Sequence, residues 1–154
     1  MSDIDKRLQR LEDIEEIRQL KYRYCAFCDD NYNPDGIAGL FAADAVWDGG
    51  PFGVAEGQAA IRELFSKAPD QIRFAVHTVA NPIIDVTGDT ATGRWYLWQP
   101  TVMRDGDQAL WLAAKYTDQY VRTAAGWRFK RLTLDLRMFS PYEAGFGKMQ
   151  MLPM

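Results

Sequence analysis

Histidine and cysteine are scarce in this sequence, which limits the metal chemistry open to it. The 154 residues contain one histidine and two cysteines, and neither an HExxH motif nor a second CxxC motif occurs. A zinc site needs three or four such ligands arranged at suitable spacings. We therefore expect no metal site.

Basic clusters and long apolar runs are also missing. The formal net charge is −3 without any block of Lys and Arg, which argues against a nucleic-acid partner. No stretch approaches 18 consecutive apolar residues, so we expect no membrane span. The first 16 residues are charged throughout and do not resemble a secretory signal, and we expect a cytoplasmic protein.

Motifs that bind nucleotides or activate a serine are absent as well. Residues 88–93 form a glycine-containing turn that leads into a strand, whereas a phosphate-binding loop precedes a helix. No GxSxG nucleophile motif occurs. We expect no cofactor.

The two cysteines, Cys25 and Cys28, form a CxxC pair late in a helical pattern. A redox CxxC instead opens a helix, where the helix dipole lowers the pKa of its thiols. We expect buried, reduced thiols.

Apolar and aromatic residues are plentiful. The chain is 47% hydrophobic and 13% aromatic, and its length suits one domain over residues 1–154. Such a supply of rings suits either a packed core or a pocket for a small hydrophobic substrate.

Three helices are predicted, and the first is long. Over residues 3–30, apolar side chains recur at three- and four-residue steps, and the turn-forming residues 31–36 end the pattern. Shorter helices are predicted over residues 36–42 and 58–67. The apolar positions of the long helix are Ile4, Leu8, Leu11, Ile14, Ile17, Leu20, Tyr24, Phe27 and Cys28.

A sheet over residues 73–139 follows these helices, and the order of elements predicts an α+β fold. We expect a curved, mostly antiparallel sheet that wraps around the long helix as a cone with an internal pocket. Pro82, Pro100 and the pair Lys130-Arg131 predict strand edges or bulges. The tail, residues 140–154, could cap the cone or reach a neighbouring subunit. The predicted strands are a short hairpin (Ala45–Asp48 and Gly53–Ala55) and Arg73–Asp85, Thr90–Met103, Gln108–Arg122 and Trp127–Phe139.

The single histidine, His77, lies in a predicted strand among small and β-branched residues. A neutral imidazole in an apolar pocket, with a carboxylate on one nitrogen, is a usable general base. Asp29 and Asp30 stand at the end of the long helix, where the helix dipole disfavours negative charge. The alternatives are a histidine satisfied within the core and a solvated helix end.

In several ordered stretches the sequence resembles the SnoaL-like branch of the nuclear-transport-factor-2-like superfamily, from about Arg10 to Phe139. Within this group it is most similar to bile-acid dehydratases and hexachlorocyclohexane dehydrochlorinase, and more distantly to scytalone dehydratase. The stretches are residues 17–21 running into Tyr24 and Asp29, then residues 91–97, 116–120 and 126–127.

The resemblance implies a cone-shaped barrel without a cofactor, and a homo-oligomer, with a trimer favoured over a dimer. It assigns His77 as the base, Asp29 as its carboxylate partner and Tyr24 as a residue that holds the substrate or its leaving group. Arg137 falls near a pocket arginine of the last strand. Gln99 stands where the bile-acid enzymes carry a further acid, so the acid that protonates the leaving group is left open.

We therefore expect a dehydratase or dehydrohalogenase that acts on a small, cyclic, hydrophobic substrate. An isomerase that uses the same His77–Asp29 pair is the first alternative, and a non-catalytic ligand-binding or assembly domain is the second. The residues expected to bind the substrate are Gln99 and four aromatic residues that form the pocket walls: Trp47, Phe52, Trp98 and Trp111.

Overall fold

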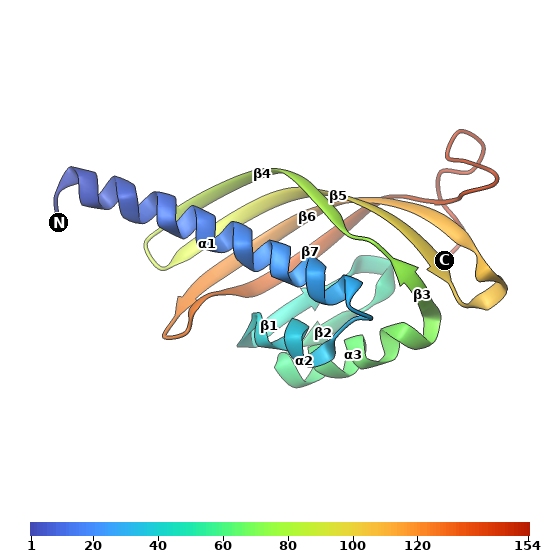
Figure 1. Cartoon of the computed structure of the whole chain (residues 1–154), viewed down its shortest axis with the longest axis horizontal. Coiled ribbons are helices and arrows are strands. Elements are labelled where there is room, and N and C mark those ends of the chain that lie inside the picture. Colours follow the sequence, from blue (N-terminus) through green and yellow to red (C-terminus); the bar gives the residue numbers. More distant parts are fainter.

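Three helices pack against one curved sheet of seven strands, and the computed structural model describes residues 1–154 (Figure 1). The predicted α+β fold is confirmed, because the sheet curls into a half-barrel with the long helix along it. The helices are α1 (Asp3–Asp29), α2 (Pro34–Gly39) and α3 (Gln58–Gln71), with short 3₁₀ turns η1 (Gly50–Phe52) and η2 (Asp105–Asp107).

The sheet has the strand order β2-β1-β7-β6-β5-β3, and β4 continues along the same edge of β5 as β3. All neighbouring pairs are antiparallel except β1 and β7, which are parallel. The strands are β1 (Phe41–Asp48), β2 (Val54–Glu56), β3 (Ile72–Ala75), β4 (Thr78–Thr87), β5 (Thr90–Met103), β6 (Ala109–Thr123) and β7 (Gly126–Pro141).

Two predicted helix ends differ from the structure. The second helix stops at Gly39 rather than at residue 42, because β1 begins at Phe41 and pairs with β7. The third helix continues to Gln71 rather than stopping at residue 67. Pro69 lies in its last turn, where the missing N–H removes a single helical hydrogen bond and is tolerated.

Two irregularities of the sheet occur where proline and the shift in the apolar pattern predicted them. The pairing of β4 with β5 shifts by one residue between Ala80 and Ile83, around Pro82. The pairing of β6 with β7 shifts between Gln119 and Tyr120, which leaves Lys130 as the extra residue of a bulge.

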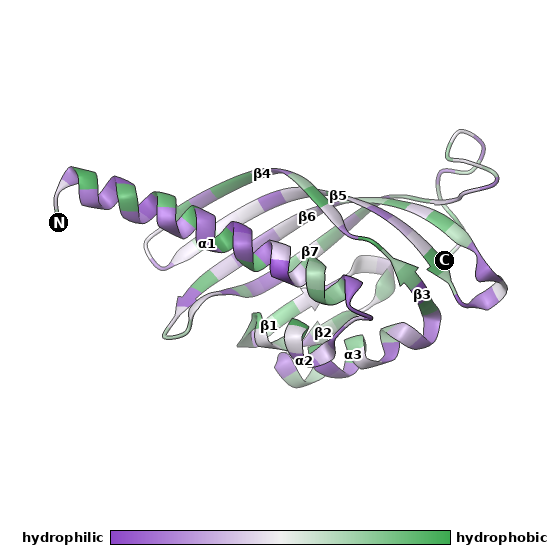
Figure 2. Ribbon diagram, viewed as in Figure 1, coloured by the Kyte–Doolittle hydropathy of each residue, from purple (hydrophilic) through white to green (hydrophobic).

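The core lies between the C-terminal two thirds of α1 and the inner face of the sheet. Ile17 and Leu20 are fully buried, whereas Ile4, Leu8 and Leu11 are exposed although they continue the same stripe. The first turns of α1 extend past the sheet (Figure 1), and Figure 2 shows hydrophobic residues on these projecting turns. None of the helices is long and apolar enough to cross a membrane.

The first turns of α1 are exposed and the later turns are buried, so the same substitution should change the stability of the protein by different amounts in the two parts. Ile17→Val removes one methylene from a fully buried side chain and should lower the unfolding free energy by about 0.5–1.5 kcal/mol. Ile4→Val makes the same change at a side chain that is 72% exposed and should change it by less than about 0.5 kcal/mol. Urea denaturation of both variants measures the contrast, and equal losses would contradict the placement of α1.

A charged pair is enclosed in this otherwise apolar core. The ammonium of Lys21 on α1 donates to Oδ2 of Asp118 on β6 at 2.9 Å, and both side chains have no exposed surface. Tyr120 also donates to Oδ2 of Asp118, whereas the other oxygen, Oδ1, has no partner. The Lys21 ammonium lies 3.4 Å from the ring centroid of Tyr116, so α1 and β6 are joined by charge as well as by packing.

Candidate active site

The predicted strand over residues 73–85 is interrupted at His77, and the interruption brings His77 to Asp29. Val76 donates its N–H to the carbonyl of Pro100 on β5, but Pro100 has no N–H to return. Successive backbone N–H groups of a strand point to opposite edges. The N–H of His77, the next residue, therefore points to the outer edge of the sheet, where the end of α1 lies. That N–H donates to Oδ1 of Asp29 at 2.9 Å.

The imidazole of His77 contacts the same carboxylate oxygen. Nδ1 of His77 lies 2.8 Å from Oδ1 of Asp29, and the His77 side chain is 6% exposed against 32% for Asp29. A carboxylate accepts hydrogen bonds, so in a neutral imidazole this contact favours the tautomer with its proton on Nδ1, whose Nε2 is an acceptor. The expected contact between these two residues is present.

A cavity of about 910 Å³ opens beside His77, and most of its lining is apolar. Its walls come from the inner face of the sheet, from α3 and from the end of α1. Five of the expected site residues line it: Tyr24, Trp47, Phe52, His77 and Gln99. Asp29 is not among the lining residues and instead supports His77 from behind the wall.

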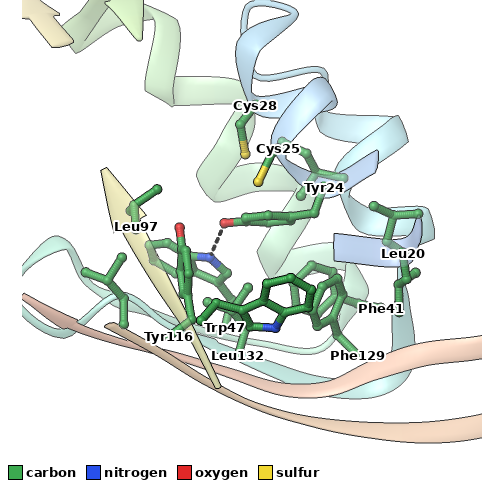
Figure 3. Packing of buried hydrophobic residues seen from close by; sticks show 14 of the residues in the cluster. Leu20, Tyr24, Cys25, Cys28, Phe41, Trp47, Leu97, Tyr116, Phe129 and Leu132 are labelled. Carbon is green, nitrogen blue, oxygen red and sulfur yellow. Dashed lines mark hydrogen bonds between the residues drawn. The ribbon is translucent and has the colours of Figure 1, made fainter. Parts of the chain in front are cut away.

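Tyr24 lies at the inner end of this cavity and is held by a tryptophan. The indole Nε1–H of Trp47 donates to the hydroxyl oxygen of Tyr24 at 2.9 Å (Figure 3). Tyr24 lines the cavity and Asp29 contacts His77, although the two residues lie on different faces of α1. This is possible because the helix ends at Asp29.

Trp98 and Trp111 do not line the cavity, contrary to expectation. They stack on each other at a centroid distance of 5.0 Å, and Trp98 is 42% exposed. Successive residues of a strand point to opposite faces, so the inward position of Gln99 sends Trp98 outward. Trp111 pairs with Pro100 and shares that outer face.

Arg137, expected near the pocket, also lies outside it. Its side chain is 64% exposed, and its nearest acidic neighbour is Asp135 at 4.0 Å. Ala113 pairs with Met138 and Ala114 pairs with Leu136, so Arg137 is the extra residue of a second bulge in β7. The sequence did not predict this bulge. Side chains alternate along β7, and Leu134 lines the cavity, so Arg137, three residues further on, points to the opposite face.

Two tyrosines that the sequence analysis did not select belong to the cavity wall. Tyr32 follows the end of α1 with a left-handed φ of 54°, a rare conformation for a bulky residue. This conformation holds its ring edge-on to His77 at 5.9 Å and stacked on Phe65 at 6.1 Å. Tyr116 on β6 contributes the second phenol. Tyr116 lies within residues 116–120, one of the stretches that carry the family resemblance. This was the signal in the sequence that could have identified it as a site residue.

Burial keeps these phenols in their protonated form. It raises the pKa of Tyr24 and Tyr116 well above their usual range, with smaller contributions from neighbouring cysteines. It likewise raises the pKa of Tyr32, and a hydrogen bond with the Gln99 side chain opposes this rise. Near neutral pH the cavity therefore offers phenol O–H groups as hydrogen-bond donors.

The two cysteines are free and buried beside Tyr24, as expected (Figure 3). Burial raises the pKa of Cys25 to about 11 and that of Cys28 further, so neither thiol is an activated nucleophile. No cluster of three or more His, Cys, Asp and Glu side chains is arranged to hold a metal ion.

Comparison with known proteins agrees with this architecture. Residues 9–133 match the SnoaL-like domain family. An uncharacterised protein of Mycobacterium tuberculosis H37Rv, Rv2910c, is 31% identical over 123 residues, which cover 79% of this chain and 83% of that protein.

Solved structures extend the likeness to enzymes. Hexachlorocyclohexane dehydrochlorinase LinA-type3 from Novosphingobium barchaimii LL02 superposes with a TM-score of 0.81 at 23% identity, covering 96% of this chain and 99% of that one. A protein of Novosphingobium aromaticivorans DSM 12444, provisionally described as a scytalone dehydratase, gives a TM-score of 0.77 at 25% identity, covering 90% and 91%. The extent of the family match establishes that this chain belongs to the SnoaL-like family.

Proposed function

We propose that this protein is a cofactor-independent lyase, a dehydratase or dehydrohalogenase, in which His77 removes a proton from a small cyclic substrate. One observation carries the proposal: the buried imidazole beside an apolar cavity is held through Nδ1 by a carboxylate at 2.8 Å. This is the arrangement that a general base requires, because the second nitrogen is free and the imidazolium form is stabilised.

The proposed step moves one proton and expels one group. Nε2 of His77 takes a proton from a ring carbon next to an activating group. The electrons of that C–H bond form a double bond to the adjacent carbon, from which hydroxide or halide departs with its bonding electrons. Asp29 stabilises the resulting imidazolium, and Tyr24 binds the substrate or assists the leaving group. Trp47 and Phe52 exclude water from the site.

The contact between His77 and Asp29 favours an enzyme over a ligand-binding or assembly domain, which would not need such a pair. Elimination and isomerisation use the same base, and the mass of the product distinguishes them. Incubation with hydroxylated and halogenated cyclic compounds should yield products lighter by water or by the hydrogen halide. A product of unchanged mass would identify an isomerase, and no conversion of any compound would favour the binding domain. The expected homotrimer stays a prediction that sedimentation can test.

Asp29→Asn tests the charge on the partner of the base. Asparagine can still accept the two hydrogen bonds from His77 through its carbonyl oxygen, but it cannot neutralise the imidazolium. Because a hydrogen bond to a charged group is stronger by about 1–2 kcal/mol than a neutral one, we expect kcat to fall about 10- to 100-fold. Asp30→Asn, at the exposed neighbouring position, is the matched control. Equal rates for both variants would remove Asp29 from the proposed mechanism.

A further inference from the structure

The first turns of α1 carry an apolar face that does not pack on the rest of the chain. Ile4, Leu8 and Leu11, called the N-terminal face below, are 72%, 53% and 64% exposed. They belong to the end of α1 that extends past the sheet (Figure 1), where Figure 2 shows hydrophobic residues. Steps of four and three residues place the three side chains on one side of the helix. Such an aligned, exposed apolar set indicates a contact with another molecule.

The N-terminal face is turned away from the side of α1 that packs on the sheet. A helix turns by about 100° per residue, so the centre of this face lies about 150° from the fully buried Ile17 and about 170° from Asp13. Asp13 accepts two hydrogen bonds at 2.8 Å from Arg122 on β6, which fixes that side of the helix on the sheet. The chain therefore leaves the N-terminal face uncovered.

Two charges of opposite sign flank this face. In a heptad with Ile4 and Leu11 at d and Leu8 at a, Arg7 occupies g and Glu12 occupies e. Neither Arg7 nor Glu12 forms an ion pair within the chain. When two such helices lie parallel, Arg7 of each copy lies beside Glu12 of the other copy. An antiparallel arrangement would instead bring the two Arg7 side chains together, so the charges favour the parallel one.

We infer that the N-terminal face binds the same face of a second copy of this chain, as a short parallel coiled coil with Arg7 and Glu12 paired in both directions. The inference is independent of the proposed function, because none of these residues lines the cavity. The sheet already holds α1 in its helical form, so pairing does not carry the entropy cost of forming a helix. The next a and d positions, Glu15 and Arg18, pair with each other at 3.8 Å and end the apolar face.

A membrane surface is the other candidate for an exposed apolar face of a helix. Helices that lie on membranes carry Lys and Arg on their polar side. The first 16 residues instead contain six Asp and Glu against three Lys and Arg. Anionic lipids repel this net negative charge, so the charges favour a second copy.

Leu8→Gln tests the apolar contact. Glutamine is a good helix former, and Leu8 is half exposed, so the variant should fold as the wild type does. We expect the dissociation constant of self-association to rise about 10-fold or more, because each copy loses a central apolar side chain. Lys6→Gln, on the opposite side of the helix, is the matched control and should change nothing. Sedimentation velocity over a range of concentrations gives these constants. Equal constants for the wild type and Leu8→Gln would overturn the inference.

Charge reversal tests the parallel orientation. Arg7→Glu and Glu12→Arg each place like charges side by side in a parallel pair, and each should raise the dissociation constant about 10-fold or more. The double variant Arg7→Glu/Glu12→Arg restores opposite charges at both contacts and should return to within about threefold of the wild type. A mixture of the two single variants should associate for the same reason. A double variant that associates no better than the single ones would contradict the parallel pair.

Ile4→Cys tests which residues meet. In a parallel pair the two copies of position 4 face each other, so mild oxidation should link them through a disulfide. Lys6→Cys, on the opposite side, should not form this link, and Cys25 and Cys28 are buried and do not compete. An antiparallel pair would place Ile4 beside Leu11 and give no link, which would contradict the inference.

Vesicles of phosphatidylglycerol test the membrane alternative with the same variants. The wild-type protein should not sediment with them. Binding that Leu8→Gln abolishes, in a protein that shows no self-association, would assign the N-terminal face to a membrane surface and overturn the inference.

Discussion

Replacing His77 with alanine is expected to lower kcat about 10²- to 10⁴-fold, the usual contribution of a positioned general base. His77 is the single histidine of the chain, so no other imidazole can take over the proton. The side chain is almost fully buried at the cavity wall, and its removal leaves a space next to the substrate. Added imidazole should therefore restore part of the rate, which a purely structural defect would not allow.

Arg137→Ala is the matched control for this experiment. Arg137 was expected in the pocket from the sequence, but its side chain is 64% exposed on the bulged part of β7. The variant should keep the wild-type rate within about threefold, since exposed substitutions away from a site have small effects. Circular dichroism and the urea midpoint establish that both variants fold. Wild-type activity in His77→Ala would refute the assignment of the base.

Lys21→Met is expected to lower the unfolding free energy by about 3–5 kcal/mol, because it leaves the carboxylate of Asp118 buried without its cation. Methionine keeps most of the volume and the apolar stem of lysine. The loss therefore reports the uncompensated charge and not a cavity. Lys67→Met removes one partner of an exposed ion pair with Glu63 and should cost less than about 1 kcal/mol.

The double variant Lys21→Met/Asp118→Leu separates the contribution of the ion pair to stability from the contributions of its two residues. Burial raises the pKa of Asp118 in spite of Lys21, so the desolvation of this pair is costly. Replacing both members with apolar side chains should recover most of the stability lost by Lys21→Met alone. Urea denaturation of the single and double variants gives the coupling. Additive losses would show that the two residues act independently.

The elements that carry the site were predictable because their signals are local. The three- and four-residue spacing predicted α1, and alternation with short turns predicted the sheet. The apolar stripe of α1 did not reveal that Ile4 and Leu8 are exposed, because a helix pattern does not record where its partner sheet ends.

Features that depend on register were not predictable. Nothing local to Trp98, Trp111 or Arg137 distinguishes the inner from the outer face of a strand, and all three side chains lie outside the cavity. The break in the first long strand follows from Pro100, which lies on a different strand some two dozen residues away. The contribution of Tyr32 depends on a left-handed backbone that its residue type disfavours.

The tautomer of His77 is the most direct test of the account, because every step depends on which nitrogen carries the proton. With one histidine in the chain, a ¹⁵N-resolved NMR spectrum of the imidazole contains a single pair of ring nitrogens. For the neutral ring, we predict a protonated Nδ1, bonded to Asp29, and an unprotonated Nε2. A neutral ring with its proton on Nε2 would leave no base at the cavity and would contradict the proposed elimination.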